Sequence, residues 1–192
     1  MGPNRTACFT GHRPSSLEGG YDKESPPNQK IIAFLVRAVQ RLKGEGFRTF
    51  IAGGALGIDQ WAADVVLGDP ELELVIALPF KGYGGNWPAE SQAVLTEQLR
   101  RAKKIHVVCE GDYAPWKNTE RNRWMVLNSE AVVAVFRGGN KGGTAHCFGY
   151  ALKNGRRILR YNPDTSEETE TSTLEPEMED ISCPEPGIVS WE

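Results

Sequence analysis

With 192 residues, 40% of them hydrophobic, and a formal net charge of −3 at pH 7, the chain has the size and composition of a single soluble domain. No apolar run reaches the ~20 residues that a membrane-spanning helix needs, the start of the chain is too short and polar for a signal peptide, and the four cysteines lack a Cys-x-x-Cys spacing. We therefore expect a cytoplasmic protein with free thiols, no membrane contact and no bound metal.

Hydrophobic periodicity predicts strands that alternate with helices along the first 160 residues. The expected strands are 6–10, 48–54, 72–80, 104–111, 131–139 and 156–161, and the expected helices lie between Pro27 and Gly44 and at 57–68, 89–102, 119–130 and 143–155. This alternation is typical of a largely parallel sheet with helices on both faces. Right-handed crossovers then make the fold class α/β, as a doubly wound, Rossmann-like domain of six strands.

The acidic residues are concentrated at the end of the chain. Residues 162–192 hold ten of the 25 acidic residues and no Lys or Arg, so residues 1–161 carry 15 acidic against 22 basic residues, a net charge of +7. We predict a folded domain over 1–161 and a flexible acidic tail over 162–192. A basic body indicates an anionic ligand that the tail screens, or else the tail only keeps the protein soluble.

A glycine-rich stretch, GGNKGGT at 138–144, follows the fifth expected strand and precedes a helix. Glycines let the backbone approach an anion closely, and a helix N-terminus favours negative charge. Its spacing matches neither a dinucleotide fingerprint nor a P-loop, so we expect no cofactor. The alternative is a turn that needs its glycines. The predicted anion contacts are Gly138, Gly139, Lys141, Gly142, Gly143 and Thr144.

Other unusual residues follow the first and second strands or lie on the fourth helix. Ligands of open α/β sheets bind beyond the carboxyl ends of the strands, which predicts one shared crevice. Asp59 either caps its helix or holds a ribose hydroxyl or Arg13. Arg121 and Arg123 lie about 200° apart on a helix, so they cannot both face one ligand unless one of them precedes the helix start. The predicted ligand contacts are Gly11, His12, Arg13, Gly53, Gly54, Asp59, Arg121 and Arg123. Three aromatic residues are candidates to stack on a base or to pack in the core: Tyr21, Tyr83 and Trp87.

Three motifs in this order, CFTGHRP, IAGGALGIDQWAA and ERNRW followed by GGNKGGTAHC, resemble the SLOG superfamily. This superfamily joins the Smf/DprA and Lonely-Guy (LOG) proteins, and TGHRP is most similar to its YpsA-like branch. The resemblance covers about residues 5–161. It implies a Rossmann-like domain that binds nucleotides or nucleotide-derived ligands, commonly as a homodimer.

The resemblance leaves three functions open. LOG phosphoribohydrolases carry PGGxGTxxE, but here Cys147 takes the place of the glutamate and no proline precedes Gly138. A thiol does not stabilise an oxocarbenium-like centre as a carboxylate does, which disfavours catalysis. We predict a nucleotide-binding sensor or regulatory module. Single-stranded DNA binding of the DprA type is the alternative, and hydrolysis of nucleoside monophosphates is the second alternative.

Overall fold

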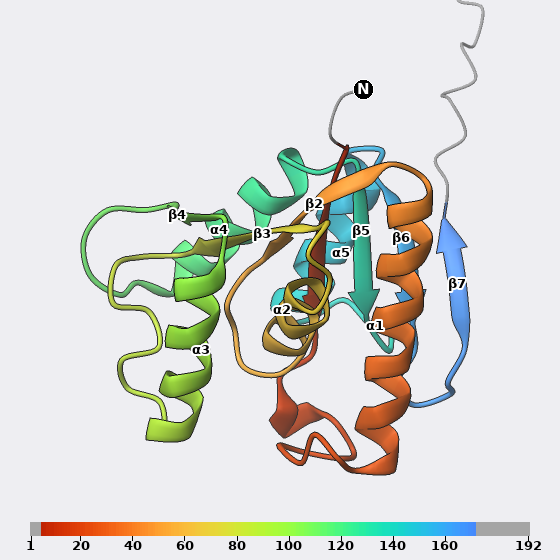
Figure 1. Ribbon diagram of the computed structural model, residues 1–192, viewed down its shortest axis with the longest axis horizontal. Helices are drawn as coiled ribbons and strands as arrows, with labels where there is room; N and C mark the ends of the chain where they lie inside the picture. The colour runs from red at the N-terminus through yellow and green to blue at the C-terminus, as the bar shows by residue number, and fades with distance from the viewer. Residues whose placement is uncertain (1–4, 172–192) are drawn as a thin grey trace, which may run out of the picture.

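The computed structural model describes residues 5–171, and helices alternate with strands along most of this part of the chain (Figure 1). The strands are β1 (Arg5–Gly11), β2 (Phe47–Ala52), β3 (Glu73–Leu78), β4 (Lys104–Val107), β5 (Ala131–Val135), β6 (Arg157–Tyr161) and β7 (Glu168–Thr171). The helices are α1 (Pro26–Gly44), α2 (Ile58–Leu67), α3 (Ala89–Arg101), α4 (Pro115–Leu127) and α5 (Gly143–Lys153), with a short 3₁₀ turn at Pro14–Ser16.

The strands form one sheet in the order β4-β3-β2-β1-β5-β6-β7. The first six are parallel, and β7 is antiparallel to β6. Helices α1, α2 and α3 cover one face, and α4 and α5 cover the other (Figure 1). The fold confirms the predicted Rossmann-like α/β class. Because β2 and β5 flank β1 on opposite sides, the strand order reverses at β1, which is where such sheets bind ligands.

The core lies against the central strands. All five residues of β5 are fully buried, as expected for a parallel strand covered on both faces. At the end of β1, a Cβ added to Gly11 would lie 2.5 Å from the Ile58 side chain. Glycine therefore lets α2 pack directly on the strand end, and this contact brings the start of α2 to the carboxyl edge of the sheet.

The predicted strand number is wrong by one, because part of the expected tail forms β7. This strand pairs with β6 from Tyr161↔Glu168 to Ile158↔Thr171, after a turn in which Ser166 donates its N–H to the carbonyl of Asn162. All four β7 residues are exposed, so no hydrophobic pattern indicated a strand. The flexible extension predicted from Asn162 is therefore wrong for 168–171, and its remainder at 172–192 lies outside the described residues.

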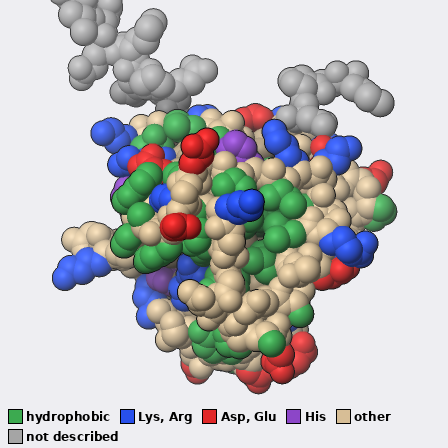
Figure 2. Space-filling model, turned by 90° about the vertical axis from the view of Figure 1, so that its left-hand side faces the viewer, with side chains coloured by type: hydrophobic (Ala, Val, Ile, Leu, Met, Phe, Trp, Pro, Cys, Tyr) green, Lys and Arg blue, Asp and Glu red, His purple; other side chains and the backbone are tan. Residues whose placement is uncertain are grey.

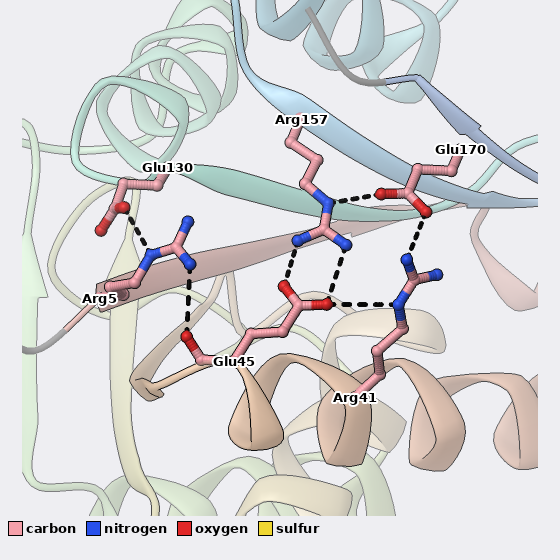
Figure 3. Close-up of polar contacts among 6 residues, drawn as sticks. All are labelled: Arg5, Arg41, Glu45, Glu130, Arg157 and Glu170. Atoms are coloured by element: carbon pink, nitrogen blue, oxygen red, sulfur yellow. Dashed lines mark hydrogen bonds and ion pairs between the residues drawn. The ribbon is translucent and has the colours of Figure 1, made fainter.

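A cluster of ion pairs holds β7 and the amino ends of the strands (Figure 3). Arg157 donates to Glu45 and to Glu170, with 2.6 Å between its Nε and Glu170 Oε1. Arg41 reaches both carboxylates, at 3.3 Å from Glu45 and 2.7 Å from Glu170. Beside them, Arg5 donates to the Glu45 carbonyl and pairs with Glu130 at 2.8 Å. We call these six residues the amino-end network.

The opposite edge of the sheet, at β4, is apolar. Figure 2 looks onto this side of the molecule and shows many hydrophobic side chains at the surface. Within β4, Ile105 and Val107 are 48% and 43% exposed, while His106 between them stacks on Trp124 with ring centres 4.1 Å apart. Over residues 5–171, no helix is both long enough and apolar enough to cross a membrane.

Candidate functional site

A crevice of about 130 Å³ opens at the carboxyl end of β1, where the strand order reverses. Its walls come from the end of β1, the loop between β2 and α2, one face of α4 and the first turn of α5. The lining residues are Phe9, Thr10, Gly11, Arg13, Ala55, Asp59, Asn118, Arg121, Asn122, Gly143 and Thr144.

The central cation of the crevice is Arg121, which is only 4% exposed. Its Nη1 donates to the carbonyl of Gly53, and its Nε donates to Asn122 Oδ1 at 2.9 Å. A Cβ on Gly53 would lie 1.9 Å from Nη1, so only glycine admits this contact. The Arg121 Nη2 group has no partner among the described residues. A guanidinium has five donor N–H bonds, so Arg121 keeps donors for a ligand.

Asp59 partly neutralises this cation. Its Oδ2 lies 3.6 Å from Arg121 Nη1 and accepts the N–H of Ala55 at 3.2 Å, and the residue is 8% exposed. It lies in the first turn of α2, as expected, but its partner is Arg121 and not the predicted Arg13. The carboxylate therefore orients the buried guanidinium. Gly54, with φ +67°, faces the Leu78 and Leu95 side chains and does not line the crevice.

The two residues after Gly11 point in different directions. Arg13 lines the crevice and donates from Nη2 to the Tyr83 hydroxyl at 3.1 Å. His12 does not line it. Its Nε2 accepts the N–H of Arg137 at 3.2 Å, and its ring packs on Phe136. Burial, together with the Arg137 charge, lowers the pKa of His12. His12 thus connects the ends of β1 and β5, whereas Arg13 faces the candidate site.

Only the last two residues of the glycine-rich stretch reach the crevice. These are Gly143 and Thr144, and the Thr144 hydroxyl donates to the carbonyl of Gly11 at 2.9 Å, which ties the start of α5 to β1. The glycines at 138, 139 and 142 have φ of +111°, +97° and +91°, a region that side chains rarely adopt. These three glycines thus meet the backbone demands of a turn, and Lys141 is exposed outside the crevice.

Helix α4 presents one face to the crevice. Arg123 lies on another face, where it pairs with Glu120 at 2.8 Å and lies over the Tyr150 ring. Two lining residues of α4 were not predicted, Asn118 and Asn122, and neither were Phe9, Thr10 and Ala55 outside this helix. The Asn118 Oδ1 is buried without a hydrogen-bond partner in the described structure, and Asn122 Nδ2 donates to the Gly143 carbonyl at 3.4 Å. The available signal was the position of Asn118, three residues before Arg121 and four before Asn122, because residues three and four apart share a helix face.

The three candidate stacking residues lie in two different cavities. Tyr21 borders a cavity of about 280 Å³ between α2 and α3, which Trp61 also lines. Tyr83 and Trp87 line a groove of about 270 Å³ after β3, together with two aromatic residues that sequence reasoning missed, Phe80 and Tyr113. Neither cavity shares a lining residue with the crevice.

The crevice offers donors and few groups for bond breaking. Among residues 5–171, Asp59 is the only acidic residue that lines it, and Arg121 and Ala55 already engage its carboxylate. Cys147 is 2% exposed, and burial raises the pKa of its thiol to about 11. Within residues 5–171, no group of three or more His, Cys, Asp or Glu side chains is placed to hold a metal. The groups that line the crevice are therefore better suited to binding an anion than to acting as a nucleophile or a general acid or base.

The doubly wound sheet, with a crevice at the reversal of its strand order, defines a Rossmann-like α/β domain. The profile of the YspA SLOG family (YpsA) matches residues 7–162, and the chain belongs to this family. It is 35% identical over 160 residues to the uncharacterized SPbeta prophage-derived protein YoqJ of Bacillus subtilis strain 168, which covers 73% of this chain and 92% of that protein. It is 26% identical over 140 residues to a UPF0398 protein of Oenococcus oeni, covering 69% and 73%.

Two solved structures share the fold. DNA processing protein A (DprA) of Streptococcus pneumoniae superposes with a TM-score of 0.55 at 15% identity, and the match covers 83% of this chain and 50% of that one. DprA of Helicobacter pylori, described for its single-stranded DNA binding mode, superposes with a TM-score of 0.58 at 18% identity, covering 85% and 68%. The chain thus spans half the length of the S. pneumoniae protein.

Proposed function

We propose that this chain binds a nucleotide or nucleotide-derived small molecule as a sensor or regulatory module, with a phosphate of the ligand in the crevice. The observation that carries the proposal is the buried Arg121 guanidinium, which lines the crevice and keeps an Nη2 group without a partner among the described residues. A buried cation is costly unless it is paired, so a doubly charged phosphate is a fitting partner.

The surroundings of Arg121 favour an anion as well. Gly143 and Thr144 open α5 and contribute backbone N–H groups that a helix leaves without partners in its first turn. Arg13 adds a second positive charge at the rim. Asn118 also lines the crevice, and its buried Oδ1 accepts no hydrogen bond in the described structure.

A thermal-shift screen on the full chain tests this function. A ligand at 100 times its Kd stabilises a protein by about 2.7 kcal/mol, so nucleotides should raise the melting temperature while nucleosides without phosphate should not. Arg13→Gln should remove the shift in a folded protein. The matched control is Arg123→Gln, an arginine two residues from Arg121 that does not line the crevice. A panel without any stabilising phosphate compound would refute the proposal.

Single-stranded DNA binding is the second candidate. It is favoured by the fold shared with H. pylori DprA and by the net charge of +3 that remains over residues 1–171, with 22 basic against 19 acidic residues. In that case affinity should fall with salt at a log–log slope near −0.7 per contacted phosphate. Because 168–171 form β7, truncation should begin after Thr171, and removal of 172–192 should tighten DNA binding. Saturable mononucleotide binding that an oligonucleotide does not displace would exclude this candidate.

Hydrolysis is the function that the crevice supports least. Asp59 is engaged by Arg121, and Glu120 pairs with Arg123. We therefore expect no release of free base from nucleoside monophosphates. Release that Asp59→Asn or Glu120→Gln stops without weakening binding would identify a catalytic carboxylate.

A cytoplasmic homodimer is part of the proposed nucleotide-binding function, and sedimentation equilibrium tests the dimer.

A further inference from the structure

We infer that the nucleobase of the ligand lies in the groove lined by Phe80, Gly82, Tyr83, Gly84, Gly85, Asn86, Trp87 and Tyr113, which we call the aromatic groove. This inference rests on the proposed function, because it assumes a phosphate in the crevice. It assigns a separate subsite for the base, outside the crevice and after β3.

The crevice is too small to hold a whole nucleotide. Pockets that hold small organic ligands usually measure about 300–1,000 Å³. The crevice measures about 130 Å³, which is too small to enclose a phosphate, a sugar and a base together. A nucleotide whose phosphate contacts Arg121 must therefore extend beyond the crevice walls.

The aromatic groove adjoins the crevice through a single contact. Arg13 lines the crevice, and its Nη2 donates to the hydroxyl of Tyr83, which lines the aromatic groove, at 3.1 Å. A ligand that leaves the crevice past Arg13 thus reaches Tyr83 next. With about 270 Å³, the groove has room for a base.

The lining of the aromatic groove suits a flat, uncharged ring. Tyr83 packs edge-on against Phe80 and Trp87, with ring centres 5.5 and 5.1 Å apart, and Tyr113 packs on Phe80 at 5.7 Å. Tyr113 is 65% exposed, so much of its ring surface is open to a ligand. The lining contains no charged side chain, and Asn86 supplies a polar group for a base edge.

The cavity at Tyr21 is the competing location, and two features disfavour it. Asp64 and Glu90 line it against one cation, Lys23, which is unfavourable for an anionic ligand. Among the described residues, no side-chain hydrogen bond joins its lining to the crevice, whereas Arg13 donates to Tyr83 of the aromatic groove.

Calorimetric titration of the full chain with inorganic phosphate, ribose 5-phosphate and adenosine 5′-monophosphate tests the inference. Base–aromatic stacking predicts that Trp87→Ala weakens adenosine monophosphate binding by roughly 5- to 150-fold. The same variant should leave ribose 5-phosphate affinity unchanged. Trp87→Phe should restore part of the loss, and Tyr113→Ala gives a second variant if Trp87→Ala unfolds. Trp116→Ala is the matched control, because Trp116 is 57% exposed and outside the groove.

Each alternative outcome has a distinct meaning. Adenosine monophosphate binding that survives Trp87→Ala and Tyr113→Ala, or that falls with Tyr21→Ala instead, overturns the aromatic groove as the base subsite. Equal affinity for ribose 5-phosphate and adenosine monophosphate in the unaltered protein also overturns it. Absence of binding by all three probes overturns the proposed function itself.

Discussion

The two ends of the sheet use the same residue types in opposite ways. In the amino-end network, three arginines contact three glutamates, and the side chains are 21–54% exposed (Figure 3). At the carboxyl end, Arg121 is almost fully buried, contacts a backbone carbonyl, and has one carboxylate at 3.6 Å. One cluster is balanced within the protein, whereas the other leaves donor capacity unused.

The arginine that is a candidate ligand contact is therefore the one whose hydrogen-bond donors are not all used within the described protein. Ion pairs near the surface contribute only about 0–1 kcal/mol each, so the amino-end network mainly holds β7 and the strand starts together. Burial of Arg121 beside a single carboxylate is unfavourable for folding alone. The phosphate of the proposed ligand would complete its hydrogen bonds.

The largest expected effect comes from Arg121→Met. Charged hydrogen bonds are worth about 1.5–3 kcal/mol each, so loss of the guanidinium should weaken a phosphate ligand by roughly 100-fold or more. Removal of one partner of a buried ion pair also costs about 3–5 kcal/mol, which urea unfolding would measure. Adding Asp59→Asn should recover part of that stability but none of the affinity. Unchanged phosphate affinity would show that Arg121 contacts no ligand and does not differ in this respect from the arginines of the amino-end network.

Gly143→Ala should weaken the ligand about tenfold, the cost of roughly one hydrogen bond, without unfolding the protein. The nearest atom to an added Cβ is Asn122 Nδ2 at 3.9 Å, so the methyl group fits but enters the crevice wall. Gly149→Ala is the matched control on the same helix, where a Cβ meets nothing within 4 Å. That control should raise stability by up to about 1 kcal/mol and leave calorimetric affinity unchanged. Equal ligand affinities of the two variants would contradict the proposal that the ligand binds in the crevice beside Gly143.

Glu45→Gln tests the opposite end and should lower stability by about 1 kcal/mol without altering ligand affinity. The hydrogen bond from Arg157 lowers the pKa of Glu45 below its ordinary 4.5. A carboxyl group with a lowered pKa stabilises the fold fully at a pH above its ordinary pKa of 4.5. This contribution disappears as the pH falls through the pKa of the folded state. The variant should therefore lose less stability than the native chain between pH 5 and pH 3. A parallel loss in both proteins would show that Glu45 contributes nothing.

The smallest effect concerns His12, at the boundary of the crevice. Burial and Arg137 lower its pKa below 6.5, partly opposed by Asp164. Its contribution to stability is therefore complete above about pH 6.5 and declines as protonation removes the acceptor of the Arg137 N–H. An NMR titration of the imidazole should give a midpoint below 6.5, and Arg137→Gln should raise it by removing the nearby charge. A midpoint at or above 6.5 would contradict this contact.

Local patterns in the sequence were sufficient for the six parallel strands, because hydrophobic periodicity reports which residues face a core. They also placed glycines and arginines at the carboxyl edge, since parallel strands end at the same side of a sheet. The β7 strand escaped this reasoning because Glu168–Thr171 is exposed throughout and is held by pairing with β6 and by arginines distant in sequence.

The choice among candidate site residues depended on contacts between distant segments. Arg121 and Arg123 are equivalent as sequence, but the packing of α4 turns only Arg121 toward Gly53 and Asp59. His12 and Arg13 diverge because the Arg137 backbone engages one and Tyr83 the other. Tyr21 lines a different cavity from Tyr83 and Trp87, because it borders α2 and α3 whereas Tyr83 and Trp87 lie in the loop after β3. Side-chain direction at a strand end is set by neighbours from other elements, and no local pattern carries that information.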